Sequence, residues 1–426
     1  MPYPQNLPLL TRATDSWHSW AQFRAERLRN KRYTYGRQWD DPVSTPSGTM
    51  SEGELLREEG GIPLSSNMVR RTVRNVTGVW RGNFEYPRPL DNTPEQRQLN
   101  ALLKTNMRLN HAAELYARTL EEFLISGLAI HRKWHGFRGG VAASWTDSVT
   151  PDTFFMDSDA SDFRGWDIRL IGQIHTLDFD TLLSRFSSDA ESATALTALY
   201  GTRSGEMCRV LEVWHRVSRP PVMPGLPPGE RWMWCYLTPD GHVLAEGETP
   251  YAHGEHPYVV KAYPYIDGEV HSFVSDIIDQ QRLINRLVSL YDRVLRASAK
   301  GVLLFPEHAL PPGADLREVA EQWSRADGVI MYTAKAGMPA PQQTGGLSAA
   351  PGITDLLTLQ MKMMEDISGV NSALQGKLES SSTSGTLYER QTRNALTSIR
   401  DLTATFDHFL TLSQAKDLSN LRQWGN

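Results

Sequence analysis

The stretch Phe273–Leu304 reads FVSDIIDQQRLINRLVSLYDRVLRASAKGVLL and decides the fold of the C-terminal third of the chain. Its apolar residues recur at intervals of three, four and seven positions, which predicts one amphipathic helix. Those residues are Ile277, Ile284, Leu287, Tyr291, Val294 and Leu295. Basic residues recur at a similar spacing, at Arg282, Arg286, Arg293, Arg296 and Lys300. This pattern indicates either a packed assembly that faces a polyanion or a surface helix whose charged face is only solvated.

The segments that follow are predicted to be mostly helical. A short insert of β-like character comes first, and a second helix follows it. A Gly/Ser-rich loop then leads into a third, long helix.

Composition limits the classes of protein that fit. The chain has 426 residues, 40% of them hydrophobic, and a formal net charge of −5, so any contact with a polyanion must be local or transient. The two cysteines, Cys208 and Cys235, lie in predicted strands and are expected to be buried thiols in a reducing compartment. No apolar run approaches the ~20 residues of a membrane span. The N-terminus also lacks the pattern of a signal peptide.

The N-terminal part is predicted to be helical. A helix is expected over residues 15–38, with Asp15 or Ser16 as its cap and Gly36 as its stop. Residues 40–63 are rich in Pro and Gly and are predicted to form an exposed loop. Further helices are predicted at Asn67–Gly82, Glu95–Asn110 and Ala112–Ser126.

The middle of the chain is predicted to be α+β. A hairpin is expected from Leu128 to Trp145, and residues 149–180 indicate a strand, an acidic turn and a second strand. Short helices are predicted at Phe179–Phe186 and Ala190–Tyr200. Strands are predicted at residues 207–217 and 231–246, with a turn at Pro239-Asp240-Gly241.

Catalytic signatures are scarce in this sequence. It contains no phosphate-binding loop, no nucleophile elbow and no H-E-x-x-H motif. The aspartates Asp157, Asp159 and Asp162 leave open a metal-dependent hydrolase, although they fail the calcium-loop template and are more typical of a capped turn. His131 and His135 lie on one face of a predicted strand and are too far apart to share a metal easily. His253 and His256 have no acidic or thiol partners at ligand spacing. No nucleophile–base pair supports an enzyme, and we expect no metal site and no cofactor.

The order of short motifs along the chain resembles that of tailed-bacteriophage portal proteins, from about residue 17 to residue 424. The most specific part is a D-Q-Q-R-x-x-N-x-x-x-S helix after an H-P-Y strand, here Asp279 to Ser289 after His256-Pro257-Tyr258. The other matching segments are Tyr35–Trp39, the Asn67–Gly82 helix, Phe123–Ala129, Pro151–Asp157 and Tyr263–Gly268.

The resemblance implies a non-enzymatic ring, usually of twelve subunits, at one vertex of the viral capsid. Double-stranded DNA would pass through its centre without sequence-specific contacts. Implied partners are the terminase large subunit, the major capsid and scaffolding proteins, and head-completion or adaptor proteins. No membrane contact is implied, and the ring would be assembled in the cytoplasm of the bacterial host. A head–tail connector ring without a translocation role is the alternative.

The resemblance also implies a portal-like α+β protomer with a defined order of parts. Residues 1–272 would form an α/β wing, residues 273–304 the first stem helix, and residues 305–350 a small α/β clip with a helix at Leu316–Ser324 and a strand at Gly328–Ala334. Residues 351–368 would be the second stem helix, residues 369–385 the tunnel loop, and residues 386–426 a long helix with little or no crown. The packed face of the second stem helix would be Leu356, Leu357, Met361, Met364 and Ile367.

Three groups of residues would carry the function implied by the resemblance. The DNA channel would be lined at the tunnel loop by Gln375, Lys377, Ser380, Ser381, Ser382, Thr383 and Ser384. The basic stripe of the first stem helix would face either the channel or the neighbouring subunits. Terminase would dock on the clip at Trp323, Arg325, Ile330 and Tyr332.

Overall fold

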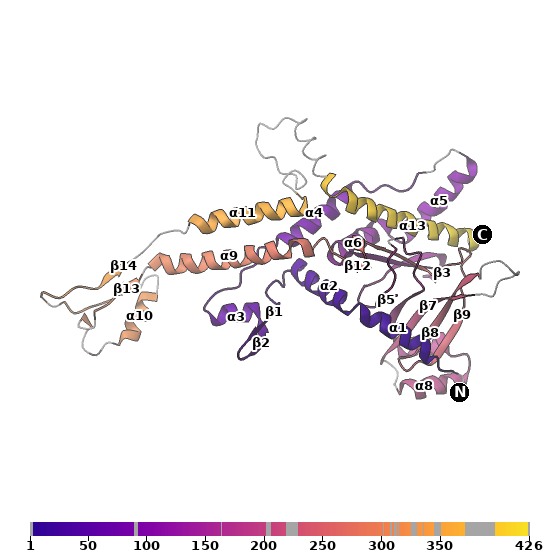
Figure 1. The fold of residues 1–426 in the computed structure, drawn as a ribbon, viewed down its shortest axis with the longest axis horizontal. Coiled ribbons are helices and arrows are strands. Elements are labelled where there is room, and N and C mark those ends of the chain that lie inside the picture. Colours follow the sequence, from indigo (N-terminus) through magenta and orange to yellow (C-terminus); the bar gives the residue numbers. More distant parts are fainter. Residues whose placement is uncertain are drawn as a thin grey trace. The chain divides into compact units, whose positions relative to one another are not determined.

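The structure is a computed structural model in which the chain forms two compact units. It describes residues 3–88, 93–162, 164–201, 206–218, 229–300, 302–306, 309–310, 313, 315–324, 330–334, 336–344, 351–370 and 397–424. The first unit comprises Met1–Gly36, Asn67–Ile278 and Glu365–Asn426, and the second comprises Arg37–Ser66 and Asp279–Met364. Helices and strands occur in both, which confirms the α+β class (Figure 1).

The first unit begins with two helices where one was predicted. They are α1 (Leu7–Ser19) and α2 (Ala21–Thr34), and they meet at Trp20. The predicted cap at Asp15 or Ser16 is wrong, because the Asn6 side chain accepts a hydrogen bond from the Leu9 amide and starts α1 earlier. Gly36 follows α2 with a φ of 91°, as expected of a helix stop.

A five-stranded antiparallel sheet forms one core of this unit. Its order is β5-β6-β7-β8-β9, with β5 (Phe154–Met156), β6 (Leu170–Asp178), β7 (Met207–Ser218), β8 (Glu230–Leu237) and β9 (Val243–Glu248). Leu9 and Ala13 of α1 pack with buried residues of this sheet, including Phe155, Val213 and Leu237.

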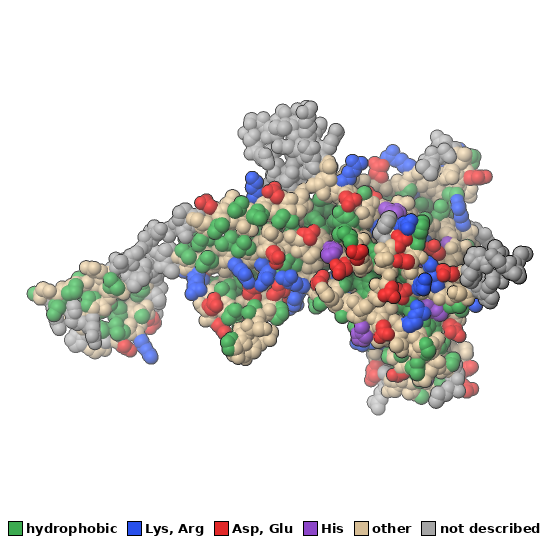
Figure 2. All heavy atoms as spheres, in the orientation of Figure 1, with side chains coloured by type: hydrophobic (Ala, Val, Ile, Leu, Met, Phe, Trp, Pro, Cys, Tyr) green, Lys and Arg blue, Asp and Glu red, His purple; other side chains and the backbone are tan. Residues whose placement is uncertain are grey.

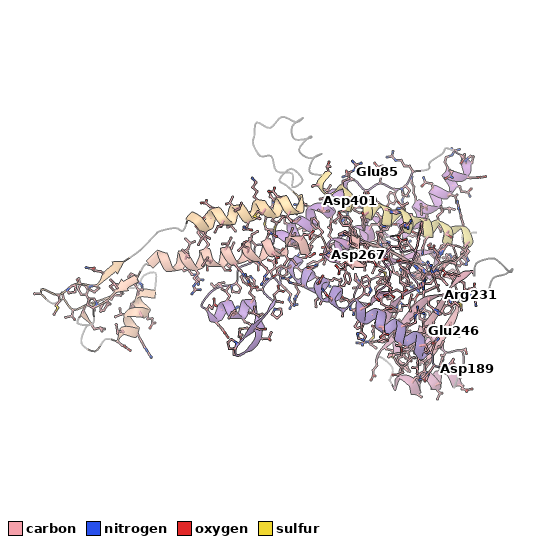
Figure 3. All side chains as sticks on the ribbon, viewed as in Figure 1. Glu85, Asp189, Arg231, Glu246, Asp267 and Asp401 are labelled. Carbon is pink, nitrogen blue, oxygen red and sulfur yellow. The ribbon has the colours of Figure 1, made fainter. Side chains whose placement is uncertain are left out.

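Two short helices pack at the end of the sheet. They are α7 (Phe179–Phe186) and α8 (Ala190–Tyr200), as predicted. Asp189, labelled in Figure 3, starts α8 with a capping box, because its carboxylate accepts the Ser192 amide at 2.8 Å. Cys208 is buried where α7 and α8 meet the sheet, and Cys235 is buried beneath α1, so both cysteines are buried as expected and neither forms a disulfide.

A three-stranded antiparallel sheet forms the other core, in the order β10-β3-β4. The predicted hairpin is β3 (Leu128–Arg138) with β4 (Val141–Ser148), and β10 (Tyr258–Ala262) pairs with the other edge of β3. A small hairpin of β11 (Tyr265–Ile266) and β12 (Glu269–Val270) follows β10. The surrounding helices are α4 (Met68–Gly82), α5 (Pro94–Leu109), α6 (Ala112–Ser126) and α13 (Arg400–Trp424).

A buried ion pair joins α13 to this sheet. Lys133 of β3 and Asp417 of α13 are both buried, and the Lys133 ammonium lies 2.5 Å from the Asp417 carboxylate. Lys133 also donates to Thr146, and Asp417 accepts from Ser144. Burial lowers the pKa of Lys133, and the Asp417 carboxylate opposes that shift. The pair therefore depends on its complete set of buried hydrogen bonds.

The second unit is built on two long helices and the insert between them. These helices are α9 (Ser275–Lys300) and α11 (Pro351–Ser368). The first residues of α9, up to Ile278, and the last residues of α11, from Glu365, belong to the first unit. Between them lie β13 (Val302–Leu304), α10 (Leu316–Ser324) and β14 (Gln342–Thr344), with β13 and β14 paired antiparallel (Figure 1).

Residues 40–63 are not the loop that was predicted. They contain the hairpin β1 (Pro42–Thr45) and β2 (Gly48–Ser51), followed by the helix α3 (Glu52–Glu58). Ser51 and Glu54 form a reciprocal capping box at the start of α3, which is the sequence signal that the Pro and Gly content obscured. This segment packs with the second unit, although the sequence analysis grouped it with residues 1–272.

Two further boundaries differ from the predictions. The first long helix ends at Lys300 rather than Leu304, because Val302–Leu304 pairs with Gln342–Thr344 as a strand. The strand predicted at Gly328–Ala334 is wrong within 330–334, where the chain forms no strand and the Thr333 amide bonds to the Ala309 carbonyl at 2.8 Å. Among the helices of the described ranges, none is long and apolar enough to cross a membrane.

Candidate functional site

A ladder of buried polar side chains lies on α9, within the second unit. Gln281, Asn285 and Ser289 are spaced four residues apart, which places them on one helix face. All three are at most 3% exposed. Buried amides and hydroxyls need hydrogen-bond partners, so this face must contact polar groups.

The partners of the ladder come from the segment that was predicted to be a loop. Gln281 donates to the Ser66 carbonyl at 2.8 Å, and Asn285 donates to the side-chain oxygen of Gln38 at 2.7 Å. The Asn285 carbonyl oxygen accepts the Ser66 amide at 3.1 Å, and Ser289 accepts the Leu64 amide at 3.0 Å. The Q-x-x-x-N-x-x-x-S spacing therefore attaches both ends of residues 37–66 to α9.

Replacing Asn285 by alanine should release this segment. The substitution leaves the Ser66 amide and the Gln38 side chain without their buried partner, which we expect to cost about 2 kcal/mol. Amide hydrogen exchange of residues 38–66 should speed up, while exchange in the five-stranded sheet should stay unchanged. Leu283→Ala on an exposed face of α9 is the control, and equal protection in both variants would contradict the assignment.

The basic stripe of α9 is partly neutralised by one buried carboxylate. Glu52, the first residue of α3, lies 3.2 Å from Arg282 and 2.5 Å from Arg286. Arg296 pairs with Asp292 on the same helix at 2.6 Å, and Arg293 is exposed. Lys300 is the last residue of α9. The role of Glu52 was not predicted, because the spacing of the basic residues within α9 does not indicate that a carboxylate from residues 40–63 pairs with them.

The other predicted site residues are placed only in part. Trp323 is half-buried in α10, Ile330 is half-buried, and Tyr332 is exposed. Arg325 lies outside the described residues, and so do the predicted channel residues Gln375, Lys377, Ser380, Ser381, Ser382, Thr383 and Ser384. The structure brings Arg282 and Arg286 together at Glu52.

The acidic turn of the first unit is occupied by protein donors. The Asp157 carboxylate accepts the Arg169 and Leu170 amides at 2.7 and 2.6 Å, and Asp162 binds the Arg164 side chain at 2.9 Å. Burial raises the pKa of Asp157, and the two amides oppose that shift. No group of three or more metal-ligating side chains occurs in the part of the chain that the structure describes. These contacts are those of a capped turn, and they give the hydrolase hypothesis no support.

A second buried carboxylate lies on the five-stranded sheet. Glu212 of β7 is 3.1 Å from Arg132 and 2.6 Å from His175, and it also accepts the Trp214 indole N–H at 2.8 Å. Burial alone would raise its pKa, but the Arg132 guanidinium and His175 hold the pKa of Glu212 well below its usual range. Among the described residues its donors Arg132, His175 and Trp214 all lie in this unit, and we interpret the cluster as a structural ion pair.

Two long helices bracket a small paired insert, and they are joined to an α+β unit that contains a five-stranded and a three-stranded sheet; this arrangement is consistent with the fold of a portal protomer. The family model described as Phage P22-like portal protein matches residues 10–423, and the chain belongs to this family. A comparison with curated proteins gives no match.

Membership of this family sets the general role of the chain. It is a bacteriophage portal protein, a component of the virion at a capsid vertex that serves genome packaging and connects head to tail. The family as a whole forms oligomeric rings that have capsid proteins and terminase as partners.

Proposed function

We propose that this chain forms a dodecameric ring whose central channel carries double-stranded DNA during packaging and ejection. The family match over residues 10–423 is the observation that carries this proposal. The proposal involves no catalytic step. Assembly would take place in the host cytoplasm, on scaffolding and major capsid protein.

The electrostatics of the second unit support a channel that guides DNA without gripping it. Each phosphate that a protein neutralises adds salt-dependent affinity, so a conduit works best with few free cations. On α9, Glu52 already engages Arg282 and Arg286, and Asp292 engages Arg296. The stripe is therefore weaker as a polyanion site than its five basic residues suggest.

The insert between α9 and α11 is the part of the chain that we assign to terminase and, later, to head-completion proteins. Tyr332 and Met331 of this insert are exposed, at 47% and 79%, and Trp323 of the same insert is half-buried. Exposed aromatic and methionine side chains are typical of docking surfaces. Arg325 and Ile330 complete the proposed docking set.

The proposal is tested first by the mass and symmetry of the purified protein. Native mass spectrometry with negative-stain class averages should show a ring of about twelve subunits, with a hole wider than about 20 Å to admit a duplex. Binding of purified terminase large subunit then separates a portal from a connector without a translocation role. Rings that never bind terminase and never support packaging would contradict the proposal.

Deleting Gln375–Gly385 should separate assembly from DNA handling. We propose that this segment is the tunnel loop, because it is small, polar and placed between the second and third long helices. The deletion should leave ring mass unchanged and lower the amount of packaged, nuclease-protected DNA. Subunits that no longer assemble would show instead that the segment has a structural role.

A further inference from the structure

A pocket with a volume of about 320 Å³ lies within the first unit, lined by both sheets and by α13. Its lining residues come from β7, β8, β10 and α13, and from the turns that precede β6 and β10. We call it the α13 pocket. Its volume is at the lower end of the range for sites of small organic ligands, so a ligand that fills it must be small.

Two hydrogen-bond donors of this pocket lack an acceptor among the described residues. They are the Nε of Arg216 and the Nε2 of His253, and both atoms are buried. Other nitrogens of the same side chains are engaged. The Nη1 of Arg216 lies 3.2 Å from a carboxylate oxygen of Glu230, and the Nδ1 of His253 accepts the Glu255 amide at 3.1 Å. Buried donors are normally paired, so these two indicate an acceptor that binds in the pocket.

The protonation of His253 follows from its contacts. Because the Nδ1 accepts a backbone amide, the neutral ring carries its proton on Nε2. Burial lowers the pKa of His253 to about 4, and the Lys416 ammonium acts in the same direction. The ring is therefore neutral at pH 7 and offers an N–H group rather than a charge.

Lys416 of α13 supplies a positive charge to the same place. Its ammonium donates to the carbonyls of His256 and Tyr258 at 2.6 and 3.0 Å, and it lies 3.3 Å from the Glu255 carboxylate. The Lys416 side chain is 13% exposed and that of Glu255 is 60% exposed, so solvent screens the acid more than the lysine. The lysine charge therefore favours an anion in the pocket.

These donors lie close to one another. Burial lowers the pKa of His256, and the charges of Lys416, His253 and Arg216 lower it further. Electrostatic influence of this kind needs short distances, so all three side chains lie near the His256 ring. A single small ligand can reach them together.

The charges of the pocket fit one carboxylate better than a phosphate or a polyanion. Arg216 and Lys416 are each already shared with an acidic side chain, Glu230 and Glu255, which leaves little capacity beyond one negative charge. Figure 2 shows acidic and basic side chains interspersed over the first unit, whereas a polyanion is attracted by a continuous basic surface. A carboxylate can accept one hydrogen bond at each of its two oxygens.

The rest of the lining is largely apolar or aromatic. Ile168, Val260 and Leu412 contribute aliphatic surface. Trp232 is buried with the Arg216 guanidinium 5.1 Å from its ring centroid, and Trp166 is 66% exposed. A ligand that fills this pocket must therefore carry its charged group on an apolar body.

We propose that the α13 pocket binds a carboxylate monoanion on a small apolar or aromatic body, with its oxygens accepting from the Arg216 Nε–H and the His253 Nε2–H. This chemistry is offered by a free organic acid and by the C-terminal residue of a protein chain. The pocket lies outside the residues that we assign to DNA and to terminase, so the inference does not depend on the proposed ring.

Titration of the full-length protein with sodium phenylacetate, followed by ligand-observed NMR, tests the proposal. Saturable binding with a Kd of about 1 mM or below is expected for a ligand of this size. Phenylacetamide has the same shape without the charge, and it should bind at least about tenfold more weakly. Tighter binding of phenyl phosphate overturns the carboxylate assignment. Absence of saturable phenylacetate binding up to about 20 mM overturns the proposal, and a pocket that other residues of this chain already fill would give that result.

Two conservative variants locate the binding. Arg216→Lys keeps the charge and loses the Nε, and His253→Phe keeps a ring and loses the N–H; each should weaken phenylacetate binding about tenfold. Arg231→Lys is the matched control, because the Arg231 Nε also lacks a described partner but the residue, labelled in Figure 3, does not line the pocket. Unchanged affinity in both pocket variants, or equal weakening in the control, overturns the proposal.

Glu255→Gln tests the sign of the ligand charge. The variant removes the carboxylate that competes for Lys416, so it should tighten phenylacetate binding about threefold. Weaker binding in this variant would mean that the site favours a cation, and it would overturn the proposal.

A peptide distinguishes the two sources of the carboxylate. N-acetyl-glycyl-phenylalanine presents the same ring and carboxylate at a chain end, with a backbone that can extend over the exposed Trp166. Binding at least about tenfold tighter than that of phenylacetate supports the proposal with a protein C-terminus as the ligand. Equal or weaker peptide binding supports it with a free organic acid as the ligand.

Discussion

Replacing Lys133 by methionine should lower the free energy of unfolding of the first unit by about 3–5 kcal/mol, because it leaves the Asp417 carboxylate buried without its cation. Lys133 and Asp417 are fully enclosed by β3, β4 and α13, and the nearest remaining donor, Ser144, is neutral. Methionine keeps most of the volume of the lysine side chain, so the loss comes from the charge rather than from a cavity.

The measurement is urea unfolding followed by tryptophan fluorescence, with hydrogen exchange of β3 and α13 to locate the effect. Removing both charges, in Lys133→Met/Asp417→Leu, should recover most of the lost stability, because no buried charge is then left unpaired. Arg118→Ala breaks an exposed pair with Glu121 and should cost less than about 1 kcal/mol. A single variant as stable as this control would show that the buried pair contributes nothing.

Replacing Glu212 by glutamine should cost about 3 kcal/mol at neutral pH and progressively less in acid. The glutamine cannot neutralise Arg132, which lies 3.1 Å from the carboxylate. The pKa of Glu212 is held well below its usual range by Arg132 and His175, although burial opposes them. A carboxyl whose pKa is depressed by folding stabilises the fold fully above its unfolded pKa of about 4.3.

The sign of the pH dependence follows from that depression. As the pH falls below the unfolded pKa, Glu212 is protonated in the unfolded chain but stays ionised in the folded chain, so the wild-type protein loses stability. The variant has no such group, and the difference in unfolding free energy between the two should shrink between pH 5 and pH 3. Glu85→Gln, which removes an exposed pair with Arg88, is the control and should show almost no difference at any pH (Figure 3). A constant gap for Glu212→Gln would mean that folding leaves the pKa of this carboxyl unchanged, and a gap that widens in acid would mean that folding raises it.

Periodicity predicted most of the helices and strands, because each is a local pattern. The Asn67–Gly82 helix, the pair before Gly127 and the hairpin around Gly139 are all confirmed. The prediction of a loop for residues 40–63 was wrong, because it relied on their Pro and Gly content and overlooked the capping box of Ser51 and Glu54.

Contacts between distant residues could not be predicted in the same way. Lys133 and Asp417 are 284 residues apart. The hydrophobic pattern of neither β3 nor α13 indicates that these two residues form a buried ion pair. The D-Q-Q-R-x-x-N-x-x-x-S motif was noticed, but the reason for it became visible only with the backbone of residues 64–66 beside α9.

Residues 37–66 are held on α9 by two sets of contacts that respond differently to ionic strength. Mobile ions weaken the pairing of the half-exposed Arg286 with the buried Glu52 in part, but they have little influence on buried neutral hydrogen bonds such as those of Asn285. Concentrated salt should therefore loosen the arginine side chain while the segment keeps its register on the helix. The same helix would then present a different charge to its surroundings in dilute and in concentrated electrolyte, without any change of fold.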